Sequence, residues 1–297
     1  MTDVQLPWCV AALLALPGFV KERIADRPLA WRYYTSICRR AGWDARCLGW
    51  HTPANGPFAG IRTQALHTNH LWVAAGVYEP VVTRCVVGLM REILARRGRA
   101  NVWDVGAHHG RFSLLCAKHG AARVLAIEPS AVNMSMLRDH LSANPALRDA
   151  VEVLHAAIAN VDGTGEFLVD ANDGAICQIR AMGVVPYERE RDPLATNVTC
   201  WRLDSLAELR GTAPDLVKID VEGAEALVLE GAAELLAREQ PVLLIEVHNA
   251  EAGTACVSRL HFAGYRVERI ARGGRLVPVT GALTYGHIVA RHRDWRS

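Results

Sequence analysis

The sequence predicts an α/β protein built on a Rossmann-like, mostly parallel β-sheet, and three observations carry that prediction. The stretch NVWDVGAHHG at 101–110 is typical of a buried strand, a glycine turn and the start of a helix. A second apolar run, RVLAI at 123–127, ends at Glu128, which follows Gly110 by 18 residues. From residue 101 onward, short apolar runs alternate with segments of helical periodicity, as in parallel sheets covered on both faces.

The individual elements follow from these alternating patterns. We expect seven strands, at 101–105, 123–127, 151–155, 215–220, 242–247, 265–270 and 284–290. We expect helices between them, at 110–119, 130–143, 223–237 and 251–263. An earlier stretch, 80–97, has apolar residues at helical spacing and stops at Gly98, which indicates a helix with a C-terminal glycine.

Two regions depart from this rhythm. Between about 160 and 203 the patterns predict a β insertion with extra short strands around a charged loop at 187–197. The first 75 residues are rich in aromatic side chains and predict helices near 6–20, 26–41 and 43–48, followed by a strand or hairpin within 61–73. We therefore divide the chain into a helical and aromatic cap, 1–75, and an α/β domain, 76–297, that contains the β insertion.

Composition excludes several classes of protein. The net charge of +2 gives no strong field for nucleic acid, and none of the eight cysteines forms a C-x-x-C pair, so we expect reduced thiols. The apolar run 6–20 is too short to span a bilayer and has no basic region before it, so we expect neither a membrane segment nor a signal peptide. A packed or interfacial helix is expected there, with a bilayer-surface helix as the alternative. The predicted location is cytoplasmic.

The glycine turn indicates which nucleoside cofactor binds. Dinucleotide sites use G-x-G-x-x-G, whose middle glycine lets the backbone approach a pyrophosphate. Here Gly106 and Gly110 enclose Ala107, His108 and His109, so the middle glycine is missing. S-adenosylmethionine has the same adenosine without the pyrophosphate, and the turn therefore favours it over NAD. Glu128 suits the ribose, because a carboxylate can accept a hydrogen bond from each of two hydroxyls.

Four stretches together resemble one protein family. They are DVGAHHG at 104–110, AIEPS at 126–130, CWRLDSL at 200–206 and LVKIDVEGAEALVLEGA at 216–232. They resemble the FkbM family of S-adenosylmethionine-dependent methyltransferases, over roughly 77–250. The resemblance implies the class I methyltransferase fold, with an antiparallel last strand, and methyl transfer that usually goes to a hydroxyl oxygen.

His108 and His109 depart from the family pattern, which often has Asn and an apolar residue there. Two consecutive histidines suggest a metal site, but we expect adjacent side chains to diverge. Both histidines are therefore interpreted as residues of the turn.

Ligands of open α/β sheets bind beyond the carboxyl ends of the strands, and this locates the candidate site residues. Asp104 ends the first strand and either fixes the glycine turn, contacts the methionine ammonium or caps the helix. The candidates for contact with the cofactor are Asp104, Gly106, Ala107, His108, Gly110, Glu128, Pro129, Asn133 and Asp220.

The candidate catalytic residues are Asp220, Glu246 and His248, at the ends of two neighbouring strands. An alcohol must lose its proton during methyl transfer, and an imidazole that titrates near neutrality suits that task, so His248 is the first choice of base. Glu246 shares its face and could orient or replace it, and Asp220 is the rival base. We do not expect a metal; if one binds, these three residues are its ligands.

The sequence thus predicts an O-methyltransferase acting on a hydroxyl of a sugar, glycolipid or polyketide-type natural product. The partner is a small-molecule or glycan acceptor, and a homodimer is compatible with the sequence. We expect the 1–75 cap on the acceptor side and S-adenosylmethionine on the 76–297 domain. The alternatives are a catalytically inactive S-adenosylmethionine-binding scaffold and, with less support, an NAD-dependent oxidoreductase.

Overall fold

The computed structural model of the chain describes residues 49–65, 73, 75–169, 177–179, 194–281 and 283–295, and single positions between 12 and 40. Most residues of the helices expected near 6–20 and 26–41, the whole of the helix expected at 43–48 and most of the charged loop 187–197 lie outside the described residues. So does most of the 1–75 cap, whose assignment stays a prediction.

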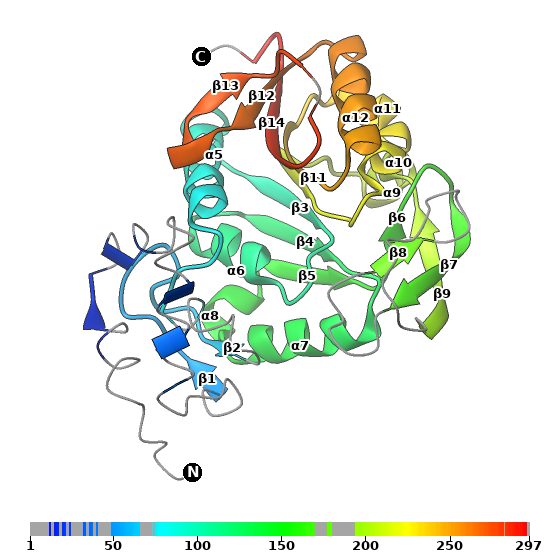
Figure 1. Cartoon of the computed structure of the whole chain (residues 1–297). Helices are drawn as coiled ribbons and strands as arrows, with labels where there is room; N and C mark the ends of the chain where they lie inside the picture. The colour runs from blue at the N-terminus through cyan, green and yellow to red at the C-terminus, as the bar shows by residue number, and fades with distance from the viewer. Residues whose placement is uncertain are drawn as a thin grey trace.

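The centre of the molecule is an eight-stranded sheet with the order β13-β12-β14-β11-β10-β3-β4-β5 (Figure 1). Neighbours from β11 to β5 pair in parallel, whereas β14 is antiparallel to both β11 and β12. The strands are β3 (Asn101–Val105), β4 (Arg123–Ile127), β5 (Val151–Leu154), β10 (Leu216–Ile219), β11 (Val242–Val247), β12 (Tyr265–Ile270), β13 (Leu276–Pro278) and β14 (Gly286–His292). This confirms the predicted Rossmann-like sheet, including its antiparallel last strand.

The eighth strand, β13, is an addition to the seven that were predicted. It contains only three residues, Leu276, Val277 and Pro278, and pairs with β12 at the outer edge of the sheet. Proline cannot donate a ladder hydrogen bond, so it is tolerated at an edge of this kind. A run this short gives no alternating pattern by which a strand could be recognised.

Helices cover both faces of the sheet, as Figure 1 shows for α5 and α7 on one side and α12 on the other. Val102 of β3 joins a core with α5, α6 and α7, while Trp103 and Val105 join a second core with α9 to α12. The helices are α5 (Pro80–Arg97), α6 (Arg111–Lys118), α7 (Ala131–Ser142), α8 (Pro145–Arg148), α9 (Leu203–Arg210), α10 (Glu225–Glu230), α11 (Ala233–Arg238) and α12 (Ala250–Phe262).

The helix predicted over 223–237 is divided into α10 and α11, and this prediction of one continuous helix was wrong. The break lies at Gly231 and Ala232. A Cβ atom at Gly231 would lie 2.1 Å from the carbonyl oxygen of Ala159. The helix is therefore interrupted where another segment of backbone packs directly against it, a tertiary contact that no helical periodicity reveals.

Two smaller β structures lie beside the main sheet. β6 (Ala157–Ile158), β7 (Gly163–Val169), β8 (Cys177–Ile179) and β9 (Leu194–Trp201) form a four-stranded sheet, in the region where extra strands were expected. β1 (Gly49–His51) pairs with β2 (Thr63–Ala65) in an antiparallel hairpin. Among the described residues, no helix is both long enough and apolar enough to cross a membrane.

The β1–β2 hairpin is fastened to α7 and, through it, to the glycine turn. The backbone N–H of Gln64 donates to Nε2 of His140 at 3.0 Å, and Nδ1 of that imidazole lies 2.8 Å from the carbonyl oxygen of His109. The backbone N–H of Arg62 donates to Oδ1 of Asn144 at 2.8 Å. A neutral imidazole with one donor and one acceptor nitrogen satisfies both contacts of His140.

Candidate active site

The glycine turn follows β3 and approaches the end of β10 very closely. Gly106 has φ +79°, and a Cβ atom there would lie 1.8 Å from the carbonyl oxygen of Asp220. Gly110 has φ +73° and precedes α6, whose first turn has no capping side chain. The N–H groups of Gly106 and Ala107 both donate to the carbonyl oxygen of Ile127 at 3.0 Å. The glycine at 106 therefore allows two strand ends to meet, in addition to any contact with a ligand.

Glu128, at the end of β4, is held in place by three donors. Its carboxylate accepts hydrogen bonds from the N–H of His108 at 2.8 Å, the N–H of Ser130 at 2.9 Å and Nδ2 of Asn133 at 3.1 Å. The side chain is buried, and burial raises its pKa although the three hydrogen bonds oppose that shift. A carboxylate offers about four acceptor positions, so a fixed Glu128 can still accept from a ribose hydroxyl.

The residues after Glu128 support this arrangement. Ser130 caps α7 by accepting from the N–H of Asn133, and Asn133 is buried at the first turn of that helix. The carbonyl oxygen of Pro129 lies 2.9 Å from Nε2 of His155. Of the predicted cofactor residues, Asn133 therefore supports Glu128 directly, and Pro129 anchors the loop through its backbone.

His108 and His109 stack on one another, with ring centroids 3.7 Å apart and an interplanar angle of 22°. The expectation that these adjacent side chains diverge was therefore wrong. His108 has φ +51°, and this left-handed backbone conformation is the reason that consecutive rings can lie together. Within the described residues, neither histidine belongs to a group of three side chains that could hold a metal ion.

Asp104 is buried beneath the turn. It accepts a hydrogen bond from Oγ of Ser113 on α6 at 2.6 Å, and Nζ of Lys218 on β10 lies 3.8 Å from its other oxygen. Lys218 also donates to Asp220 at 3.0 Å, two residues further along the chain, where alternate side chains share one face. Asp104 is not a helix cap, because the capping position of α6 is Gly110. Its contacts brace the turn.

The three predicted catalytic residues lie together at the carboxyl ends of β10 and β11: Glu246 is the penultimate residue of β11, and Asp220 and His248 directly follow β10 and β11. Nε2 of His248 is 3.7 Å from Asp220, 3.6 Å from Glu222 and 3.9 Å from Glu246. These distances are too long for hydrogen bonds and place a ring of carboxylate oxygens around one nitrogen. The atoms of Asp220, Glu246 and His248 lie within 4.8 Å of one another, the spacing of a candidate metal-binding group.

Glu225 is the residue that orients His248, and sequence reasoning missed it. Its buried carboxylate lies 2.7 Å from Nδ1 of His248 and also accepts from the N–H of Gly223 at 2.8 Å. In the sequence, an acid at the start of a helix is explained by the helix dipole alone. Only the packing of α10 against β11 gives it a second role.

Glu246 has different partners from those expected. Its carboxylate lies 3.0 Å from Nε2 of His287 on β14 and accepts from the hydroxyl of Tyr285 at 3.1 Å. It therefore pairs with His287 and does not orient His248. Burial raises the pKa of Glu246, but His287 outweighs burial and lowers it. Glu79, Glu246 and His287 form a second candidate metal-binding group, which no pattern in the sequence indicated.

The charge of His248 also differs from the expectation. Burial by itself lowers the pKa of this imidazole, but the hydrogen bond to Glu225 and the charges of Glu225, Glu222 and Asp220 raise it to about 9. The histidine is therefore cationic at neutral pH in the ligand-free chain. Burial, assisted by Asp220 and Glu246, raises the pKa of Glu222 to about 7 against the opposing charge of His248. The cluster holds more negative than positive groups, so it favours a cation.

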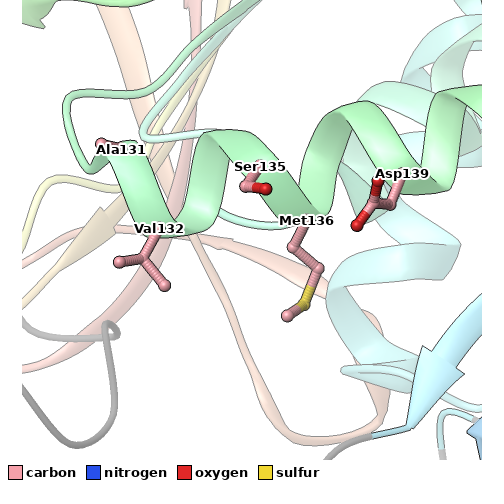
Figure 2. Close-up of a pocket in the computed structure, with 5 residues that line it drawn as sticks. All are labelled: Ala131, Val132, Ser135, Met136 and Asp139. Atoms are coloured by element: carbon pink, nitrogen blue, oxygen red, sulfur yellow. The ribbon is translucent and has the colours of Figure 1, made fainter.

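An open hollow of about 470 Å³ lies elsewhere, on the outer face of α7. Figure 2 shows its lining side chains along one side of the helix: Ala131, Val132, Ser135, Met136 and Asp139. The opposite face of α7 carries Asn133 and Leu137 into the core. None of the predicted site residues lines this hollow, and it is separate from the cluster around His248.

Comparisons with known proteins identify one family. A family model described as methyltransferase FkbM domain matches residues 104–267, which is more than half of the chain. No curated protein matches the sequence. A solved structure of methyltransferase FkbM from Methylobacillus flagellatus KT is similar, with 15% identity and a TM-score of 0.43. The alignment covers 76% of this chain and 54% of that one, so the match spans about half of the Methylobacillus protein.

Two other solved structures are distantly similar. An O-methyltransferase from Bacillus cereus in complex with SAH has 15% identity and a TM-score of 0.40, covering 71% of this chain and 81% of that one. The precorrin-6y C5,15-methyltransferase from Geobacter metallireducens GS-15 has 16% identity and a TM-score of 0.42, covering 74% and 90%. The domain match, rather than these distant likenesses, defines the family.

Proposed function

Because the chain belongs to the FkbM methyltransferase family, whose cofactor is S-adenosylmethionine, we propose that it methylates a hydroxyl oxygen of a small-molecule or glycan acceptor. A sugar, glycolipid or polyketide-type natural product is the proposed acceptor class. The observation that carries the proposal is the cluster of Asp220, Glu246 and His248, which lies at the strand ends where the glycine turn meets β10.

The residues at the turn fit S-adenosylmethionine. Glu128 is buried, fixed by three donors and still able to accept from a ribose hydroxyl. The proposed cofactor contacts also include the turn residues Gly106, Ala107, His108 and Gly110. Asp104 supports this turn from below, and Asp220 faces the cationic part of the cofactor.

For this reaction the protein must align the acceptor hydroxyl with the methyl group and remove the hydroxyl proton. When bound, S-adenosylmethionine supplies a methyl group on a sulfonium that is already a good leaving group. We propose that His248 accepts the hydroxyl proton at Nε2 while Glu225 holds the ring through Nδ1. A positive charge bound among Asp220, Glu222 and Glu246, such as the sulfonium, would lower the pKa of His248 toward neutrality. Nε2 would then lose its proton near neutral pH and be able to accept one from the hydroxyl.

Two simple measurements test this function. S-adenosylhomocysteine should raise the melting temperature of the purified protein and NAD should not, because ligands that bind only the folded state stabilise it. Methyl transfer to candidate sugars and polyketides should then persist in EDTA. If EDTA abolishes activity and Mg²⁺ or Mn²⁺ restores it, the group that activates the hydroxyl would be a metal ion bound by Asp220, Glu246 and His248, and not the His248 base. Cofactor binding without transfer to any acceptor tested would favour an inactive scaffold.

A further inference from the structure

Arg111 is a buried arginine, and two of its hydrogen-bonding nitrogens lack an acceptor within the described part of the chain. It is the first residue of α6, directly after Gly110, and only 4% of it is exposed. Its Nε and Nη2 groups have no hydrogen-bond acceptor among the described residues. Buried donors are nearly always paired, and buried guanidinium groups above all, so two unpaired donors at one residue indicate an absent acceptor.

The surroundings of Arg111 place it beside the proposed cofactor site. Its guanidinium carbon lies 5.1 Å from the centre of the Tyr78 ring. The charges of Arg111, Glu79 and Asp220 all act on the hydroxyl of Tyr78. Tyr78 therefore lies near Arg111 and also near Glu79 and Asp220. It shares a side-chain hydrogen bond with Arg111, and the charge of Glu79 acts on the guanidinium as well. Arg111 itself directly follows Gly110, the last residue of the glycine turn.

The chemistry of this position favours an anion. The N-terminus of α6 carries a partial positive charge, and its first turn has no capping side chain. A guanidinium at the same point adds a full positive charge and a planar fork that matches a carboxylate. The neighbouring cluster has the opposite character and favours a cation.

We propose that Arg111 binds the carboxylate of the amino-acid arm of S-adenosylmethionine, an inference that rests on the proposed cofactor site. That arm carries a carboxylate and, close to it, two positive groups: the ammonium and the sulfonium. With the ribose at Glu128 and the sulfonium facing the acidic cluster, the arm must pass the glycine turn. Arg111 is a buried, incompletely paired cation at that turn, and a carboxylate there would supply the acceptor that its guanidinium lacks.

Two ligands that differ only in the carboxylate test this directly. S-adenosylhomocysteine carries it, and its decarboxylated analogue, S-adenosyl-3-thiopropylamine, keeps the adenosine, the thioether and the amine. Calorimetry on Arg111→Gln should show affinity for S-adenosylhomocysteine lowered about 10- to 100-fold, and affinity for the analogue unchanged. Arg111→Lys, which keeps the charge without the fork, should lie between the wild type and Arg111→Gln.

The control is Arg97→Gln, which removes a partly buried arginine paired with Asp215 at 2.6 Å, beside the N-terminal end of β3. It should change neither affinity. An equal loss for both ligands in both Arg111 variants would make Arg111 a support of the turn and overturn the proposal, as would no loss at all. Wild-type protein that binds neither ligand would instead refute the proposed function.

Discussion

Glu128 makes three hydrogen bonds within the protein, so its carboxylate is fixed before a ligand binds. Glu128→Ala should lower the affinity for S-adenosylhomocysteine about 10- to 100-fold, because a charge-assisted bond contributes about 1.5–3 kcal/mol. Titration calorimetry measures this. Glu152→Ala, which removes an exposed acid paired with Arg210, is the control and should leave affinity unchanged. An unaltered affinity in Glu128→Ala would remove this residue from the cofactor site.

His248 is the residue on which turnover should depend most. His248→Ala should lower kcat about 10²- to 10⁴-fold, the usual range for a general base, with little change in cofactor affinity. Single-turnover methyl transfer and calorimetry separate the two effects. His261→Ala, at an exposed position of α12, should behave as the wild type. Full activity of His248→Ala in metal-free buffer would leave Asp220 or alignment alone as the source of catalysis.

At the scale of the elements, the glycine turn passes so close to the end of β10 that, of the described glycines, Gly106 has the least room for a Cβ atom. Gly106→Ala should both lower the stability by more than about 2 kcal/mol and weaken cofactor binding, because its Cβ would overlap the carbonyl oxygen of Asp220. The turn sequence by itself predicts that Gly106→Val abolishes binding while the sheet survives. The close approach to Asp220 predicts that the edge of the sheet is damaged as well.

Gly98→Ala is the matched control, because Gly98 also has a left-handed φ, +70°, but a Cβ atom added there would meet no other atom within 4 Å. Urea denaturation of the two variants separates backbone strain from the steric overlap. Equal losses of stability in Gly98→Ala and Gly106→Ala would show that the close approach to Asp220 contributes nothing.

The attachment of the β1–β2 hairpin should depend on pH through His140. Burial lowers the pKa of His140 to about 4, although the hydrogen bond to His109 opposes this shift. The folded state therefore binds its proton more weakly than the unfolded state, whose histidine titrates near 6.5. The contribution of neutral His140 to the free energy of unfolding is fully present above about pH 6.5. It is lost as the pH decreases toward 4, and the loss is about 2–3 kcal/mol at pH 4.5.

This dependence can be measured by comparing the wild type with His140→Gln, which has no titrating group at this position. The free energy of unfolding should fall more steeply in the wild type between pH 7 and pH 4.5. Carboxylates titrate in both proteins, so their contribution cancels in the difference. Parallel curves would mean that His140 is protonated without cost.

At the scale of the whole molecule, the features that could be predicted are those that leave a periodic or regularly spaced pattern in the sequence. All seven predicted strands are present, because buried parallel strands are short apolar runs with turn residues between them. The gathering of Asp220, Glu246 and His248 was predictable for a similar reason, since the carboxyl ends of neighbouring parallel strands share one edge.

Other features depend on contacts between segments far apart in the sequence. Glu225 orients His248, and His287 pairs with Glu246, only because α10 and β14 pack beside β11. The pKa of about 9 at His248 likewise requires several carboxylates to surround one imidazole. The break between α10 and α11 follows from the approach of Ala159. None of these contacts can be recognised from the residues next to it in the sequence.

The most direct test of the account is a crystal structure with S-adenosylhomocysteine bound. It should show the ribose hydroxyls on the carboxylate of Glu128 and the thioether sulfur turned toward Asp220 and His248, with the glycine turn beneath the ligand. A ligand bound in the hollow on α7, or one whose sulfur faces away from His248, would contradict the proposed methyl-transfer site.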